Sequence, residues 1–171
     1  MINGSLVTLR PWSSEDLLDL QQLRNDIKLQ SQLMAKPKGS SVEQVKAWIS
    51  SRSNNPQSIF FIIADRVNNK AIGYLQLVDL DLFVGVGHLG ICLSPDIQGQ
   101  GFGSESLLLF EDYMKKIFCL RKIMLQVLAS NEKAIRFYVH TGFREVGKLQ
   151  KHYRTPAGFE DVLVMEKLID Q

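Results

Sequence analysis

Residues 93–107, LSPDIQGQGFGSESL, place a glycine-rich loop between an apolar run and the start of a helix-like pattern. Glycine stands at positions 99, 101 and 103, and large apolar residues then recur at helical spacing up to residue 118. Glycines let a backbone approach an anion closely, and the unpaired N–H groups of a first helical turn point at it. A strand, a glycine loop and a helix start, in this order, predict a phosphate-binding loop.

Two well-known phosphate loops do not fit these letters. A P-loop ends in Gly-Lys-Ser or Gly-Lys-Thr, and no lysine lies between Lys70 and Lys115. A dinucleotide loop needs glycine where Ser104 stands and an acidic residue at the end of the next strand, which residues 122–128 lack. A glycine-rich turn without a ligand is the remaining alternative, although a bare turn needs one such glycine rather than three.

Composition limits the partners and the compartment. With 171 residues, 45% hydrophobic and 22% charged, the chain is expected to form one domain, residues 1–171. The net charge is +2 and no basic run exceeds two residues, so a nucleic-acid partner is not expected. No apolar stretch approaches the ~18 residues of a membrane span, and the first residues do not resemble a signal peptide.

The cysteines and histidines carry no metal or disulfide signature. Cys92 and Cys119 lie in apolar surroundings and are predicted to be buried thiols in a reducing cytoplasm. His88, His140 and His152 lack the spacing of metal ligands. We therefore expect a cytoplasmic protein without a metal.

Hydrophobic periodicity predicts the order of helices and strands. The predicted strands are residues 5–10, 59–64, 71–78, 82–93, 122–128, 144–149 and 161–167, and a polar loop at 150–158 joins the last two. The predicted helices begin near residues 14, 41, 104 and 131, and the first is expected to carry Leu17, Leu20, Leu23 and Ile27 on one face. A hairpin turn at 67–70 implies antiparallel strands, whereas the helix after the glycine loop implies a parallel crossover. The expected fold is α+β, with a mixed twisted sheet of about seven strands and four helices.

The motif Gln98-x-x-Gly101-x-Gly103 resembles the acetyl-CoA pyrophosphate loop of the GNAT family of N-acetyltransferases. A second motif runs from Asn131 through Tyr138 to Phe143, and the element order resembles the GNAT fold over nearly the whole chain. The segments at 9–11, 23–26, 131–143 and 158–165 are most similar to the RimJ/RimL-type branch, which includes ribosomal-protein, spermidine and amino-sugar acetyltransferases. This resemblance implies an acetyl-CoA-dependent N-acetyltransferase.

The resemblance also implies how the cofactor is held. The backbone of Ile91, Cys92 and Leu93 is expected to pair with the pantetheine arm as an added strand would. The residues whose amides are expected to bind the pyrophosphate are Gln98, Gly99, Gln100, Gly101, Phe102, Gly103 and Ser104. Asn131 suits a helix N-cap and, by resemblance, contacts the pantetheine arm.

Tyr138 is the predicted general acid by the same resemblance. It lies seven residues after Asn131, hence two helical turns on and on nearly the same face. A phenol pKa of about 10 and a thiol pKa of about 8.5 differ by roughly 1.5 units, or about 2 kcal/mol, which bond breaking can offset. A tyrosine that only packs in the core is the alternative.

The base and the acceptor site are less marked. Residues 87–93 contain no carboxylate, so His88 is the candidate base by residue type, with a structural histidine and a water-mediated route as alternatives. Arg24, Asn25 and Asp26 interrupt an apolar helix face, although a solvated helix end explains them equally well. The carboxylates that can bind a cationic amine, or pass its proton through water, are Asp79, Asp81 and Asp161. No cluster of acidic residues indicates a polyamine site.

These observations predict direct attack of a primary amine on acetyl-CoA in a ternary complex, because no cysteine or serine lies in a nucleophile motif. The acceptor is expected to be a protein N-terminus or a small amine such as an amino sugar or polyamine, and the protein a monomer or homodimer. A non-catalytic acyl-CoA-binding sensor on the same fold is the alternative. A nucleotide-binding domain is disfavoured by the missing lysine and acidic residue.

Overall fold

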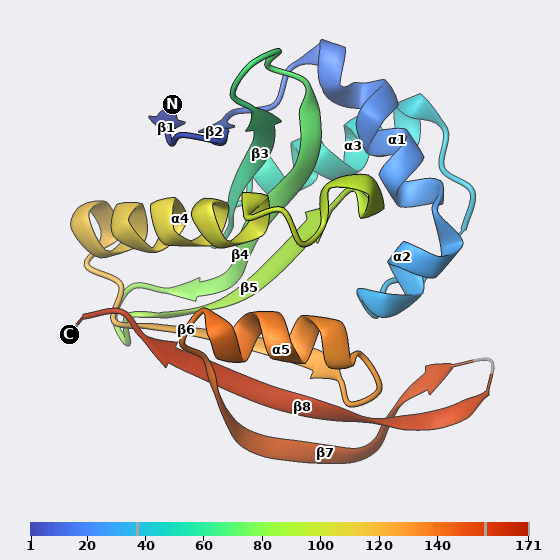
Figure 1. The fold of residues 1–171 in the computed structure, drawn as a ribbon, viewed down its shortest axis with the longest axis vertical. Helices are drawn as coiled ribbons and strands as arrows, with labels where there is room; N and C mark the ends of the chain where they lie inside the picture. The colour runs from blue at the N-terminus through green and yellow to red at the C-terminus, as the bar shows by residue number, and fades with distance from the viewer. Residues whose placement is uncertain (37, 156, 171) are drawn as a thin grey trace.

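A computed structural model of the chain describes residues 1–36, 38–155 and 157–170 (Figure 1). Its strands are β1 (Ile2–Asn3), β2 (Val7–Arg10), β3 (Ile59–Asp65), β4 (Ala71–Asp81), β5 (Val86–Leu93), β6 (Lys122–Leu128), β7 (Arg144–Thr155) and β8 (Gly158–Leu168). Its α-helices are α1 (Leu17–Asn25), α2 (Ile27–Gln32), α3 (Val42–Ser53), α4 (Phe102–Phe118) and α5 (Glu132–His140). No helix among the described residues is long and apolar enough to cross a membrane.

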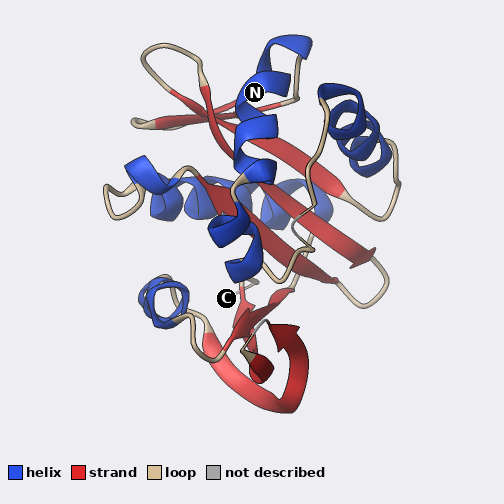
Figure 2. Cartoon of the chain, turned by 90° about the vertical axis from the view of Figure 1, so that its right-hand side faces the viewer, coloured by secondary structure: helices blue, strands red, loops and turns tan. Residues whose placement is uncertain are grey.

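The strands form one mixed sheet in the order β1-β2-β3-β4-β5-β6-β8-β7, with helices on both sides (Figure 2). All neighbouring strands are antiparallel except β5 and β6, which are parallel. One core packs α4 and α5 on one face of the sheet, and a second core packs α1, α2 and α3 on the other. The predicted α+β class and mixed sheet are confirmed, with eight strands and five α-helices where about seven and four were expected.

The first predicted helix is divided in two at Asp26. Its backbone is extended there (φ −73°, ψ 100°), and its side chain accepts a hydrogen bond from the Leu29 amide at 2.9 Å. Asp26 thereby caps α2, because a short acidic side chain competes with helical hydrogen bonding. The prediction that Ile27 shares the buried face was wrong, since it is 70% exposed.

Two strand boundaries differ from the prediction. The strand expected from residue 82 begins at Val86, because the Asp81 carboxylate accepts hydrogen bonds from the amides of Phe83 and Val84 and closes a turn. The polar loop expected at 150–158 is largely strand, since β7 runs to Thr155 and β8 starts at Gly158, while Pro156 lies outside the described residues. Much of β7 is exposed, so its letters lack the alternation that marks a half-buried strand.

The parallel pair β5 and β6 opens partway along its length. Pairing joins Val86 to Lys122, Gly87 to Ile123 and His88 to Met124, whereas β5 continues to Leu93. In Figure 1 the two strands meet near the C-terminus and diverge toward α2 and α5. Beyond His88 one edge of β5 therefore has no strand partner in the described part of the chain. Such an edge can pair with an extended ligand.

Glu105, in the first turn of α4, ties the N-terminal segment to the helix. Its carboxylate accepts hydrogen bonds from the amides of Ser5 (2.8 Å), Leu6 (2.7 Å) and Val7 (2.9 Å) and from the Ser5 hydroxyl. Burial opposes ionisation, but these donors outweigh it and hold the Glu105 pKa below its ordinary value. The carboxylate is thus committed to residues 5–7, away from the glycine loop.

Glu105→Gln is expected to lower the free energy of unfolding at neutral pH by about 1–3 kcal/mol, the range for hydrogen bonds to a charged group. Because the folded pKa is depressed, this contribution is complete above the unfolded pKa of about 4.3 and is lost as the pH falls through the folded pKa. Urea unfolding of both proteins from pH 7 down to about pH 3 measures the difference. Glu132→Gln, in the exposed first turn of α5, is the control and should change stability by no more than about 0.5 kcal/mol. A difference that does not narrow in acid would contradict this account of Glu105.

Candidate active site

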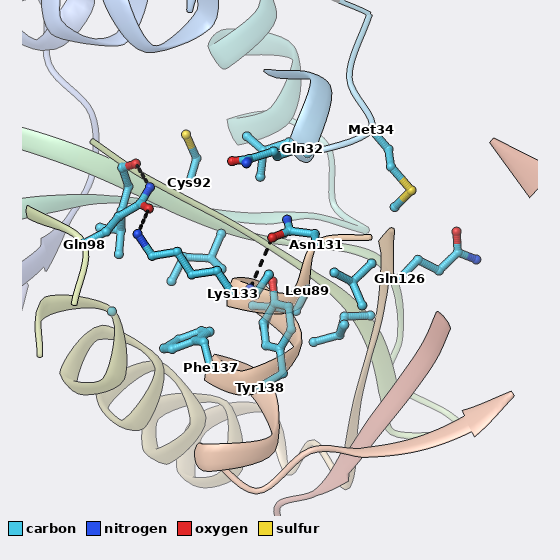
Figure 3. A pocket seen from close by; sticks show the side chains of 18 of the residues that line it. Gln32, Met34, Leu89, Cys92, Gln98, Gln126, Asn131, Lys133, Phe137 and Tyr138 are labelled. Carbon is cyan, nitrogen blue, oxygen red and sulfur yellow. Dashed lines mark hydrogen bonds between the residues drawn. The ribbon is translucent and has the colours of Figure 1, made fainter. Parts of the chain in front are cut away.

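A cavity of about 810 Å³ follows the opening between β5 and β6. It is lined by α2 and the residues after it, by β4, β5 and β6, by the glycine loop and by α5 (Figure 3). The predicted site residues that line it are His88, Ile91, Cys92, Leu93, Gln98, Gly99, Gly101, Gly103, Ser104, Asn131 and Tyr138. The tertiary structure therefore brings together residues from two motifs that lie about 30 positions apart in the sequence.

Gln100 and Phe102 do not line the cavity with the others. The Gln100 side chain donates to the Asp96 carbonyl at 2.9 Å, and Phe102 packs against the core beneath α4. The prediction for both residues concerned their backbone amides, and it stays a prediction.

The three positions of the loop require glycine for different structural reasons. Gly99 and Gly101 have φ of +85° and +90°, a left-handed conformation that other residues rarely adopt. A Cβ at Gly103 would lie 2.9 Å from Leu93 Cδ1, so this position needs glycine for close packing. The amide of Glu105 donates to the Gly101 carbonyl at 3.0 Å and starts the helical ladder, so the amides of residues 102–104 precede it and can meet an anion. The Gln98 amide, in contrast, donates to the Pro95 carbonyl at 3.4 Å.

Lys133, which the sequence reasoning missed, lies beside this loop. Its ammonium donates to Gln98 Oε1 at 2.9 Å, and Gln98 Nε2 donates to the Leu93 carbonyl at 3.0 Å (Figure 3). Among the described residues that line the cavity, Lys133 is the one lysine or arginine. A cation next to backbone amides suits a phosphate ligand. In the sequence, the position of Lys133 two residues after Asn131 was the one signal that could have placed it near the predicted site.

Asn131 and Tyr138 lie on α5 as their spacing predicts. Asn131 Oδ1 accepts from the Ala134 amide at 3.2 Å, which confirms the N-cap. The Tyr138 ring is 8% exposed and packs against Phe137 and Phe143. Its hydroxyl points toward the gap between the strands (Figure 3) and makes no hydrogen bond to another described residue. Burial raises the pKa of Tyr138 to about 12, so the phenol stays protonated.

His88 faces the cavity next to Asp79. Its Nδ1 lies 3.9 Å from Asp79 Oδ2 and is buried without a hydrogen-bond partner in the described part of the chain. Asp79 has a left-handed backbone (φ 50°) at an irregularity between Val78 and Asp81. Such a bulge redirects a side chain, here toward the imidazole. The role of His88 as a base stays a prediction.

The two cysteines differ in exposure. Cys92 is 1% exposed, and burial raises the pKa of its thiol to about 12. Cys119 is exposed, so the prediction that both thiols are buried was wrong for it. Cys119 is the C-cap of α4 and has a left-handed backbone (φ 52°), so it lies after the last turn that packs on the sheet.

The four predicted acceptor residues do not line the cavity. The Arg24 guanidinium stacks over the Trp48 ring at 4.1 Å, and the Asn25 amide exchanges two hydrogen bonds with the Ser40 backbone. Asp26 caps α2, and Asp161 pairs with Lys148 at 2.8 Å. These contacts hold the scaffold, and a role of these residues toward the acceptor stays a prediction.

The end of the cavity away from the glycine loop, which we call the acceptor end, is formed mostly by residues that the sequence reasoning missed. They are Leu29, Gln32, Leu33 and Met34 around α2, Gln76 and Val78 on β4, and Gln126 on β6. Asp79 on β4, which the sequence offered as a partner for a cationic amine, lies with them. The first helix divides at Asp26, and α2 then buries Leu29 in the core against the sheet. The sequence marked an interruption of the apolar face at Asp26 but not the new direction of α2. Within the described residues no group of three or more histidine, cysteine or acidic side chains is arranged to hold a metal.

Comparison with known proteins agrees with this geometry. A family model described as an acetyltransferase (GNAT) domain matches residues 7–144. The spermidine N(1)-acetyltransferase of Vibrio cholerae is 27% identical over 159 residues, which cover 93% of this chain and 91% of that protein. The [ribosomal protein bS18]-alanine N-acetyltransferase of Escherichia coli is 36% identical over 75 residues, or 44% of this chain and 50% of that protein.

A solved structure of the Vibrio cholerae spermidine N-acetyltransferase, in complex with CoA and spermine, has a TM-score of 0.88 at 26% identity and covers 96% of both chains. The glycine loop, the open edge of β5 and the α5 motif therefore occur in a fold for which CoA binding is established. These relatives are consistent with the RimJ/RimL-like branch. The chain belongs to the GNAT family of acetyl-CoA-dependent N-acetyltransferases.

Proposed function

We propose that the protein transfers the acetyl group of acetyl-CoA to the primary amine of a small molecule by direct attack in a ternary complex. The observation that carries this proposal is the cavity, which passes through the opening between β5 and β6 and reaches both the glycine loop and α2. Two substrates that enter from opposite faces of the sheet can meet there without a covalent intermediate. Two relatives act on spermidine and on the alanine of a ribosomal protein, so both acceptor classes occur among similar proteins.

The cofactor binds along the open edge of β5. The pantetheine arm pairs with the backbone of Ile91, Cys92 and Leu93, and the pyrophosphate lies over the amides of residues 98–104. Lys133 adds a positive charge next to these amides, and Asn131 contacts the pantetheine arm from the start of α5. Lys133 can exchange Gln98 Oε1 for a phosphate oxygen without leaving the loop.

In the reaction, the neutral amine attacks the thioester carbonyl, the C–N bond forms and the C–S bond breaks. The oxyanion is stabilised by a backbone amide of β5, for which Leu93 is the candidate. The amine nitrogen loses one proton, to His88 or to water, and the departing sulfur gains one from Tyr138. Placement of the amine against the thioester supplies much of the acceleration.

The whole chain, residues 1–171, acts in this proposal as one N-acetyltransferase domain in the cytoplasm, as a monomer or homodimer. Support comes from the two cores, which share a single sheet, and from the two free thiols, which suit a reducing compartment.

Thiol release from acetyl-CoA in the presence of a panel of primary amines tests the function. The expected result is release that depends on one class of amine and yields its N-acetyl product by mass spectrometry. Acetyl-CoA binding without release for any amine would contradict the proposal and favour a non-catalytic acyl-CoA sensor.

Cys92→Ala is expected to retain substantial activity. Cys92 lies at the cavity, but its thiol pKa of about 12 keeps it protonated and therefore poorly nucleophilic. Initial-rate plots at several fixed acceptor concentrations should intersect rather than run parallel. Parallel lines, or an acetylated Cys92 trapped after mixing with acetyl-CoA alone, would overturn direct transfer.

A further inference from the structure

The acceptor end of the cavity lies on the sheet face covered by α2. Tyr74 and Cys92 are opposite each other and belong to the core under α1, α2 and α3. Side chains alternate between the faces of a strand, so the opposed pairs Gln76–Gly90 and Val78–His88 lie on the same face. All four of these residues line the cavity.

The polar groups at this end are mostly neutral amides. Gln32 comes from α2, Gln76 from β4 and Gln126 from β6, so three elements each contribute one. An amide both donates and accepts hydrogen bonds, as a hydroxyl group does. The remaining surface is aliphatic, from Leu29, Leu33, Met34 and Val78. Neutral amides beside an aliphatic wall suit a ligand that carries hydroxyl groups on a carbon skeleton.

Gln76 holds an unused acceptor. Its Oε1 is buried and has no hydrogen-bond partner among the described residues. The amide extends across Gly90, where a Cβ would lie 3.1 Å from Gln76 Nε2, so the glycine makes room for it. A buried acceptor without a partner is costly, and a donor from a ligand in the cavity would satisfy it.

Carboxylates are scarce at this end. Among the described residues that line the cavity, Asp79 supplies the one carboxylate, and its side chain is 81% exposed at the rim. A polyamine keeps at least one further ammonium group beside the reacting amine, and a buried ammonium group needs a charged partner. Asp26 acts electrostatically on the lining residue Cys92 from outside the lining, but Arg24 opposes its charge there. This end of the cavity therefore offers a second or third cation little net stabilisation.

The segment after α2 also contacts β7. The hydroxyl of Tyr153 on β7 donates to the carbonyl of Ala35, directly after Met34, at 3.5 Å. This contact joins the β7–β8 hairpin to the segment that lines the acceptor end.

We propose that the acceptor is a small hydroxylated primary amine, with the chemistry of an amino sugar, and that Gln76 Oε1 accepts a hydrogen bond from one of its hydroxyl groups. The proposal rests on the acetyltransferase function proposed above and names its substrate class.

Thiol release with amino sugars that bear the amine at different ring positions, with spermidine and with an alanine-led tetrapeptide tests this assignment. We expect kcat/KM for one amino sugar to exceed that for spermidine and the peptide by at least about 100-fold, because a site built for hydroxyl groups discriminates strongly. Spermidine or the peptide as the best acceptor would overturn the inference but leave the acetyltransferase function standing. Release with none of the amines would overturn the proposed function itself, and the inference with it.

Gln76→Leu separates recognition from folding. It should lower kcat/KM for the amino sugar by about 10-fold or more, and this loss should disappear with the analogue that lacks the recognised hydroxyl. The acetyl-CoA affinity of Gln76→Leu should equal that of the wild type, which would show that the variant is folded. Gln150→Leu on the exposed surface of β7 is the matched control. If Gln76→Leu lowered kcat/KM by the same factor for the amino sugar and for each of its deoxy analogues, the proposed hydrogen bond would be refuted.

A charge swap tests the electrostatic argument. Gln126→Glu adds a carboxylate at an exposed lining position. It should raise kcat/KM for spermidine by about 10-fold relative to the amino sugar, since a new ion pair becomes possible. No relative gain would show that missing carboxylates do not set the acceptor preference.

Discussion

Tyr138→Phe is expected to lower kcat by roughly 10²–10⁴, the range for the loss of a positioned acid, with acetyl-CoA affinity within a few-fold. Phenylalanine preserves the ring contacts to Phe137 and Phe143 and removes the hydroxyl that faces the cavity. Stopped-flow or steady-state thiol release measures kcat, and calorimetry measures affinity. Tyr113→Phe on α4 is the control, because that ring packs against Phe61 and Phe118 outside the cavity.

The raised pKa of Tyr138 sharpens this expectation. Against a thiol pKa of about 8.5, a phenol pKa of about 12 widens the mismatch to roughly 3.5 units, or about 5 kcal/mol. The hydroxyl therefore first donates a hydrogen bond to the departing sulfur, and proton transfer is completed as the C–S bond breaks. A group with a raised pKa loses its proton only at higher pH. Deprotonation of Tyr138 should therefore cause no loss of kcat at any pH below about 10.5. A wild-type kcat in Tyr138→Phe would mean that water is the acid.

Gly101→Val should abolish most of the thermal stabilisation by acetyl-CoA. A ligand that binds the folded state at 100 times its Kd stabilises it by about 2.7 kcal/mol, so a 100-fold loss of affinity removes nearly all of the shift. Gly101 has φ of +90°, and a β-branched residue there forces the loop to another conformation and turns the amides of residues 102–104 away from the anion.

The apo protein should tolerate this change. The nearest atom to a Cβ at position 101 is Leu6 Cδ1 at 3.4 Å, so backbone strain of about 1–3 kcal/mol is the main cost. Thermal melts with and without acetyl-CoA give both quantities. Gly39→Val is the matched control, because a Cβ there meets no atom within 4 Å and the position lies outside the glycine loop. An unchanged shift in Gly101→Val would mean that the loop does not bind the cofactor.

Local signals in the sequence determined most of the side of the cavity that we assign to the cofactor. The three glycines and the apolar pattern after them predicted the loop and α4, because left-handed backbone and helix starts depend on a few adjacent residues. The predicted strand at 122–128 coincides with β6, since a strand buried on one face alternates clearly. Asn131 was predicted as an N-cap for the same local reason, and its spacing placed Tyr138 on the face that meets the cavity.

Where local signals in the sequence were weak, the observed ends of strands differ from the predicted ones. Asp81 closes a turn in a stretch whose letters are apolar, and exposed β7 lacks an alternating pattern. The exposure of Cys119 depends on where α4 ends relative to the sheet, which apolar neighbours in the sequence do not reveal.

The sequence by itself determined the fold class, the family resemblance and the glycine loop, because each depends on patterns of residues close together in the chain. Only the tertiary structure decided the acceptor side. The opening of β5 from β6, the turn of α2 toward the sheet and the meeting of Gln76 with Gly90 join segments dozens of residues apart. Strand register and helix packing set these contacts, and neither leaves a local pattern that one sequence can display.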